Sequence, residues 1–89
     1  MNSFSRKVYK VVLIIPLGEV RTYKWVAKKI GHPKAFRAVG QALKNNPYPL
    51  IIPCHRVIGS GGSLGGYSGG LKKKKALLDL ERQIKQLMV

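Results

Sequence analysis

Two breaks of proline and glycine, near residues 16–18 and 31–33, divide the first half of the sequence into short segments. Before the first break, apolar residues recur at helical spacing from Phe4 to Ile15, and lysine and arginine fall elsewhere on the same helical wheel. Proline lacks a backbone N–H, and glycine loses the most conformational freedom on ordering, so both end helices. The sequence therefore predicts short helices separated by tight turns.

The two helices expected after the first break form a pair. Thr22 is a good N-cap for a helix over residues 23–30, and Gly31 is placed to end it. Proline is tolerated in the first turn of a helix, so a further helix is expected over residues 34–45. Two helices joined by a short turn are typical of a helix-turn-helix, whose second helix meets DNA.

The charge balance favours a polyanionic partner. Seventeen Lys and Arg stand against three acidic residues, which gives a formal net charge of +14. A solubilising surface normally mixes both signs, so a solvated face explains the lysines but not the scarcity of acids. Nucleic acid is therefore the expected partner. The cations on or beside the predicted helix pair are Arg21, Lys24, Lys28, Lys29, Lys34, Arg37 and Lys44.

Length and composition set the organisation of the chain. Eighty-nine residues, 45% of them hydrophobic, indicate one folded domain over residues 1–89. The longest apolar stretch is far below the ~20 residues of a membrane span, and no signal-peptide pattern opens the chain, so a cytoplasmic location is expected. A single cysteine excludes an internal disulfide and a multi-thiolate zinc site. We expect neither a metal nor a cofactor.

The second half has a different character. The prolines between residues 47 and 53 disfavour helix and predict an extended, buried segment over Tyr48–Ile52 that presents Cys54 at its end. The glycine-rich Gly59–Gly70 predicts a loop or a small hairpin wing. A last helix is expected over Lys72–Met88. Its expected packed stripe consists of Ala76, Leu77, Leu80, Ile84 and Leu87.

Cys54 is the candidate nucleophile. A lone intracellular cysteine is commonly a small buried hydrophobe, but a reactive thiol needs a base or cation nearby, and His55 and Arg56 are its neighbours. Adjacent side chains of an extended chain point in opposite directions, so a water bridging Cys54 and His55 is the easier geometry. A carboxylate should orient the imidazole. The residues alone leave open which one, and the candidates are Glu19, Asp79 and Glu81.

Five blocks of sequence stand in a fixed order: Arg37-Ala38-Val39-Gly40, Asn46-Pro47, Pro53-Cys54-His55-Arg56-Val57, Gly66-Tyr67-Ser68-Gly69-Gly70 and Leu77-Leu78-Asp79-Leu80-Glu81. Together they resemble the alkylguanine-DNA alkyltransferases, the methylated-DNA-protein-cysteine methyltransferases. The resemblance implies a mainly α, winged helix-turn-helix-like domain with an extended active-site segment. It also implies DNA repair in which alkylated guanine is flipped out of duplex DNA and its O6-alkyl group moves irreversibly to Cys54, in a single turnover.

The resemblance implies roles around the thiol. Cys54 would be the nucleophile, and His55 would act as its base through a water molecule. Glu81 would hold His55 in the useful tautomer, which leaves Asp79 at the surface. Asn46 would brace the cysteine loop.

The resemblance also implies DNA contacts. Arg37 would fill the gap left by the rotated nucleotide, and Tyr23 would contact the flipped base and its phosphate. The family approaches the minor groove, for which Phe36 is large, so Phe36 either packs inward or wedges against sugars. The further contacts would be Lys34, Ala35 and Lys44 on DNA, and Val57, Tyr67 and Ser68 around the guanine.

Two other functions stay open. An alkyltransferase-like module would bind alkylated DNA without transfer, but such proteins replace the cysteine that this sequence keeps. A basic architectural winged-helix protein with an inert Cys54 would explain the charge but not the Cys-His-Arg block. Most family members carry a further N-terminal domain, which is expected to be absent here. The expected form is a monomer on double-stranded DNA containing alkylated guanine.

Overall fold

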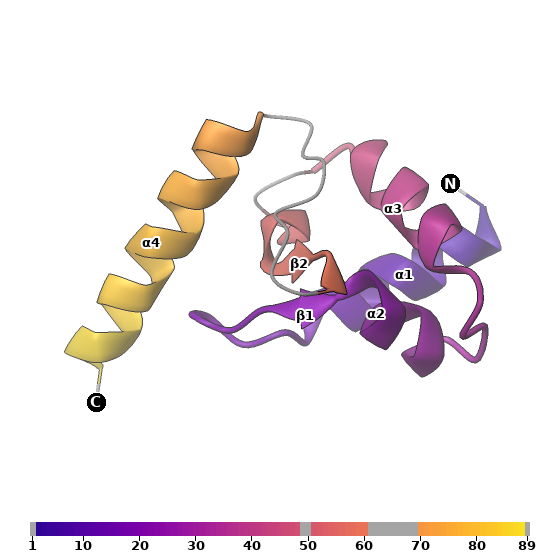
Figure 1. Cartoon of the computed structure of the whole chain (residues 1–89), viewed down its shortest axis with the longest axis horizontal. Helices are drawn as coiled ribbons and strands as arrows, with labels where there is room; N and C mark the ends of the chain where they lie inside the picture. The colour runs from indigo at the N-terminus through magenta and orange to yellow at the C-terminus, as the bar shows by residue number, and fades with distance from the viewer. Residues whose placement is uncertain (1, 49–50, 61–69, 89) are drawn as a thin grey trace.

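The computed structural model describes residues 2–48, 51–60 and 70–88 (Figure 1). Its elements are α1 (Ser3–Leu13), β1 (Arg21–Thr22), α2 (Tyr23–Lys29), α3 (Phe36–Lys44), the 3-10 helix η1 (Cys54–Arg56), β2 (Val57–Ile58) and α4 (Leu71–Leu87). The predicted mainly helical class is confirmed. Most of the expected glycine-rich wing, residues 61–69, lies outside the described residues. Of the helices described, none is long and apolar enough to cross a membrane.

Helices α1, α2 and α3 pack against one another around a common core. The Asn2 side chain caps α1 by accepting a hydrogen bond from Ser5 N at 2.7 Å, a cap that the sequence pattern did not reveal. The buried Tyr9 hydroxyl donates to the Ala42 carbonyl at 2.7 Å, which joins α1 to α3 and satisfies a polar group inside the core. Five side chains of these three helices have no exposed surface: Val8, Val12, Val26, Ala27 and Val39.

The predicted helix-turn-helix is formed by α2 and α3. Thr22 caps α2, its hydroxyl accepting from Trp25 N at 3.0 Å. Gly31 follows the helix with a φ of +82°, a left-handed conformation that glycine adopts without steric cost. Both signals in the sequence are confirmed.

Helix α3 begins later than expected, at Phe36 instead of Lys34. Residues 32–35 form a separate turn, which is closed by a 2.9 Å hydrogen bond from Ala35 N to the His32 carbonyl. Lys34 and Ala35 therefore precede the helix, and their side chains are set by the turn.

The short strands β1 and β2 join distant parts of the chain. They pair in parallel, with Arg21 opposite Val57 and Thr22 opposite Ile58. The segment that enters α2 is thereby fixed beside the segment that leaves Cys54.

The expectation of an extended segment over Tyr48–Ile52 is wrong at the residues described. Ile52 N donates to the Tyr48 carbonyl at 2.8 Å and closes a turn, and Cys54–Arg56 then forms one turn of 3-10 helix. Proline excludes a long helix here because it removes backbone donors, but a single turn tolerates it.

Helix α4 stands apart from the three-helix group and contacts the rest chiefly through η1 (Figure 1). The expected packed stripe is wrong, since Leu77 is half-buried and the other members are exposed: Ala76, Leu80, Ile84 and Leu87. The buried residues are instead Lys74, Leu78 and Glu81, which share one face at helical spacing. A cation and a carboxylate thus face inward.

The turn after α1 touches α4. Gly18 has a φ of +80°, and a Cβ added there would lie 2.7 Å from Lys85 Cδ and 3.4 Å from the Glu81 carbonyl oxygen. The neighbouring Glu19 carboxylate lies 3.4 Å from Lys85 Nζ. Gly18 therefore permits the close approach of α4 to the rest of the protein.

Candidate active site

Cys54 opens the 3-10 turn and is buried, with 4% of its surface exposed. Its backbone N–H donates to the Ile52 carbonyl at 2.7 Å. Successive side chains of a 3-10 helix are about a third of a turn apart, so Cys54 and His55 are not opposed as they would be in an extended chain. The 3-10 turn therefore allows the side chains of Cys54 and His55 to lie on the same side of the chain.

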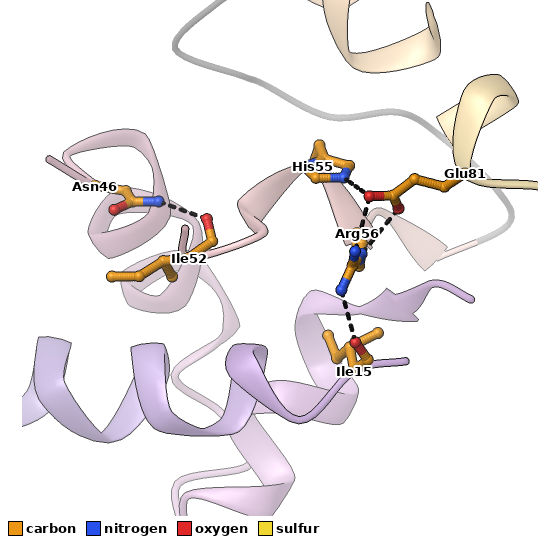
Figure 2. Close-up of polar contacts among 6 residues, drawn as sticks. All are labelled: Ile15, Asn46, Ile52, His55, Arg56 and Glu81. Atoms are coloured by element: carbon orange, nitrogen blue, oxygen red, sulfur yellow. Dashed lines mark hydrogen bonds and ion pairs between the residues drawn. The ribbon is translucent and has the colours of Figure 1, made fainter. Parts of the chain in front are cut away.

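His55 and Glu81 are brought together although they come from η1 and α4. His55 Nε2 lies 2.8 Å from Glu81 Oε2, and both residues are buried (Figure 2). Asp79 is exposed, as expected. Glu19 pairs with Arg21 at 2.8 Å. Of the three acidic candidates, the one that reaches His55 is therefore Glu81.

Arg56 has a place that the sequence did not suggest. Its Nε and Nη2 donate to the two oxygens of Glu81, each at 2.8 Å, and Nη1 donates to the Ile15 carbonyl at 3.0 Å (Figure 2). Two parallel bonds from a guanidinium fix a carboxylate firmly. This cation, two residues after Cys54, thus positions Glu81 and connects it to the turn that follows α1.

The protonation of this group follows from its contacts. Burial raises the pKa of Glu81, but hydrogen bonds from Arg56 and His55 lower it by more, so the net shift is downward and Glu81 is ionised at neutral pH. An ionised carboxylate only accepts, so His55 Nε2 donates to it. In the neutral imidazole the basic nitrogen is then the buried Nδ1.

The Cys54 thiol is not ionised in the resting protein. Burial raises the pKa of Cys54, and this outweighs the lowering by an Asn46 side-chain hydrogen bond and by the charge of Lys74. At neutral pH Cys54 is therefore protonated, and a nucleophilic reaction requires a proton acceptor.

Asn46 holds the turn that leads to Cys54. Its Nδ2 donates to the Ile52 carbonyl at 3.0 Å, and its Oδ1 accepts from Tyr48 N at 2.9 Å (Figure 2 shows the first bond). The Asn46 side chain is buried, and its bond to the Ile52 carbonyl is shielded from water. This geometry suits the bracing role that the resemblance implies.

Four of the expected DNA-contact residues line one open cleft beside α3: Tyr23, Phe36, Arg37 and Lys44. Arg37 and Lys44 are exposed there. Phe36 is half-buried and packs against the core, which agrees with the inward alternative. Lys34 and Ala35 line a separate hollow at the turn before α3, so the structure does not gather all six expected contacts.

The guanine-pocket positions are only partly described. Val57 is fully buried in β2, and its carbonyl accepts a 2.7 Å hydrogen bond from Lys74 Nζ. Tyr67 and Ser68 lie outside the described residues. The sequence groups Lys74 with the basic start of the last helix, and nothing in the charge pattern separates it from its neighbours.

Comparisons with known proteins agree with one family. A family model described as "6-O-methylguanine DNA methyltransferase, DNA binding domain" matches residues 3–83. The methylated-DNA–protein-cysteine methyltransferase of Mycobacterium tuberculosis is 53% identical over 81 residues, which are 91% of this chain and 49% of the relative. The Methanosarcina barkeri relative of that name is 56% identical over 80 residues, 90% of this chain and 51% of the relative. The chain thus spans about half the length of these relatives.

Solved structures share the fold. Mycobacterium tuberculosis OGT in complex with DNA matches with a TM-score of 0.91 and 51% identity, over 93% of this chain and 52% of that one. S. pombe Atl1, in complex with damaged DNA containing O6-carboxymethylguanine, matches with a TM-score of 0.82 and 40% identity, over 91% of this chain and 77% of that one.

Proposed function

Because the chain belongs to the 6-O-methylguanine DNA methyltransferase family, we propose that it repairs guanine alkylated at O6 by moving the alkyl group to Cys54. One observation carries this proposal. The only cysteine of the chain is followed directly by a buried imidazole that is hydrogen-bonded to an ionised carboxylate. Such a line of groups suits a thiol that must lose its proton at the moment of reaction.

In the proposed reaction His55 Nδ1 accepts the Cys54 proton through a water molecule, and the sulfur attacks the alkyl carbon. The new S–C bond forms as the C–O6 bond breaks, and the bonding pair of that C–O6 bond stays on the guanine. Guanine then takes up one proton, so that the sum is thiol plus alkylguanine giving thioether plus guanine. Glu81 stabilises the imidazolium that forms in between, and Arg56 holds Glu81 in place.

The product explains why the reaction would stop after one event. A thioether carries no good leaving group, and the chain has no second cysteine to displace it. The protein would therefore be consumed stoichiometrically, and it needs no cofactor for the step.

The cleft beside α3 is the proposed contact with double-stranded DNA. Arg37 and Lys44 are exposed cations on it, and Tyr23 also lines it. In the proposal Arg37 replaces the extruded nucleotide in the stack, and Tyr23 contacts the flipped base. Lys34, Ala35 and Phe36 are proposed as flanking DNA contacts. Val57, Tyr67 and Ser68 are proposed to line the guanine pocket.

A lesion-binding module without transfer is the second candidate, favoured by the likeness to S. pombe Atl1 in complex with damaged DNA. That function would use the cleft beside α3 but would not need the hydrogen-bonded pair of His55 and Glu81 next to Cys54. We further propose that residues 1–89 form a single domain and that this domain binds DNA as a monomer. We also propose a cytoplasmic location.

The test is the mass of the protein after incubation with one equivalent of a duplex oligonucleotide containing O6-methylguanine. We expect one added methyl group on Cys54 and none on the matched variant Cys54→Ser. Selective binding of the methylated duplex with no added mass would instead support the lesion-binding module. Equal binding of methylated and unmethylated duplex, again with no added mass, would leave a basic architectural protein.

A further inference from the structure

Three exposed lysines stand at the start of α4: Lys72, Lys73 and Lys75, which we call the α4 lysine patch. Like charges at such short spacing repel one another, and cations in the first turn of a helix oppose its macrodipole. The sequence of that turn contains no acid that would reduce the repulsion. The patch is therefore a concentration of positive charge that lowers the stability of its own helix.

The chain has no acidic side chain left to balance the patch. Each of its three acidic residues has a basic partner elsewhere. A solvated surface normally mixes both signs, so an unbalanced patch favours an anion from outside the chain. The existing pairs are Glu19 with Arg21 and Lys85, Asp79 with Arg82, and Glu81 with His55 and Arg56.

The α4 lysine patch lies beside the cleft along α3. Lys74, between Lys73 and Lys75, places its Nζ 5.9 Å from the centre of the Tyr23 ring. The same ring packs against α3, since a Cβ added at Gly40 would lie 3.8 Å from Tyr23 Cε1, and Tyr23 also lines the cleft. Successive residues of a helix are about 100° apart, so Lys73 and Lys75 flank the inward-facing Lys74 on either side. Tyr23 thus connects the patch to the cleft.

One DNA duplex is long enough to reach both places. The longest dimension of the protein is 36 Å, about the length of one turn of duplex DNA. Duplex DNA carries about one negative charge per 1.7 Å of its axis, so phosphates are present along its whole length. A duplex held in the cleft by Arg37 and Lys44 can therefore also bring phosphates to the α4 lysine patch.

We propose that the α4 lysine patch binds phosphates of the DNA backbone outside the cleft beside α3. The proposal rests on the proposed function for its partner, duplex DNA, but it does not depend on alkyl transfer. A lysine ammonium is a point charge on a flexible stem that donates hydrogen bonds and accepts none, so it suits phosphate and does not read the base sequence. The patch therefore strengthens binding to methylated and unmethylated duplex alike.

The test measures how binding of the full chain to an unmethylated duplex of about two helical turns depends on salt. Each phosphate contact contributes about 0.9 to the slope of log K against log salt concentration. The triple variant Lys72→Gln, Lys73→Gln, Lys75→Gln should lower that slope by about two to three units and weaken binding about tenfold or more. Lys73→Gln and Lys75→Gln alone should each lower it by about one unit.

The matched control removes the same charge from another helix. The triple variant Arg6→Gln, Lys7→Gln, Lys10→Gln replaces three exposed cations of α1 and should lower the slope by less than about one unit. Because both triple variants lose the same net charge, the difference between them reports the position of the patch. Cooperative thermal unfolding establishes that both are folded, and the α4 variant should be at least as stable as the parent because repulsion in its first turn is relieved.

Equal slopes for the α4 variant and the α1 control overturn the proposal. Loss of binding to phosphatidylglycerol vesicles by the α4 variant, with unchanged binding to DNA, also overturns it, since the patch would then be a membrane contact. A lowered slope in a protein that transfers no methyl group would reject the proposed repair function while retaining the patch. Normal methyl transfer with an unchanged slope would reject the patch while retaining the repair function.

Discussion

Arg56 donates two hydrogen bonds of equal length to Glu81, 2.8 Å from Nε to Oε1 and 2.8 Å from Nη2 to Oε2. The same Glu81 oxygen that binds Nη2 also lies 2.8 Å from His55 Nε2. One carboxylate from α4 therefore organises two consecutive residues of the cysteine turn. Because Arg56 holds Glu81 still, His55 has one preferred orientation and one preferred tautomer.

Replacing Glu81 with glutamine should slow transfer strongly while leaving DNA affinity nearly unchanged. The amide cannot hold His55 and Arg56 as a carboxylate does, and it cannot stabilise the imidazolium. We expect a loss of about 100-fold in the single-turnover rate on methylated duplex. Asp79→Asn removes an exposed charge from the same helix and serves as the control. Equal rates for Glu81→Gln and the parent would remove Glu81 from the mechanism.

The stability of the fold should fall at acid pH because of Glu81. Its folded-state pKa lies below the ordinary 4.5, so its stabilising contribution is complete above that pH and is lost as the pH falls through the folded-state value. Urea unfolding from neutral pH down to about pH 3 should show a steeper decline for the parent than for Glu81→Gln. Glu19→Gln, which alters a pair that is open to solvent, should change the curve less. Parallel curves for the parent and Glu81→Gln would contradict this prediction.

Removing the Asn46 side chain should loosen the cysteine turn. Asn46→Ala leaves the Ile52 carbonyl and the Tyr48 N–H without their partner, so the free energy of unfolding should drop by about 1–3 kcal/mol. The pKa of the Cys54 thiol, measured by pH titration of the protein, should also rise, because a hydrogen bond that lowers it is lost. Asn45→Ala, at the exposed neighbouring position, is the matched control. A stability equal to that of the control would exclude a bracing role.

Arg37→Ala should affect duplex DNA more than the isolated base. If Arg37 stabilises the gap left by the flipped nucleotide, its loss should slow repair in duplex about tenfold and leave the reaction with free O6-methylguanine nearly unchanged. Arg82→Ala removes an exposed arginine from α4 and controls for overall charge. The comparison of the two substrates decides the role, and equal slowing of both would speak against extrusion.

Local signals in the sequence predicted the helix pair correctly. The Thr22 cap and the Gly31 stop depend on a few neighbouring residues, so they can be read without knowing the rest of the fold. The start of α3 was placed too early, because the turn over residues 32–35 competes with the helix and has no strong signature.

The inward face of α4 could not be predicted from its apolar spacing. The leucines at 80 and 87 define an apolar stripe, yet the buried face is the one with Lys74 and Glu81. Glu81 faces inward because it pairs with His55 and Arg56, and Lys74 does so because it donates to the Val57 carbonyl. These partners come from another part of the chain. The resemblance pointed to Glu81, and the structure brings Glu81 to His55, but the contacts of Arg56 and Lys74 became visible only in three dimensions.

Gly18 gives the protein an unexpected point of vulnerability. A side chain at this bend would require a strained backbone conformation and would meet the Lys85 side chain, so it should weaken the contact of the last helix with the bend and disturb the neighbouring Glu81–His55 pair. A substitution there should thus slow the proposed transfer, even though Gly18 is not itself one of the proposed active-site residues. Screens for loss of repair should accordingly recover Gly18 together with Glu81.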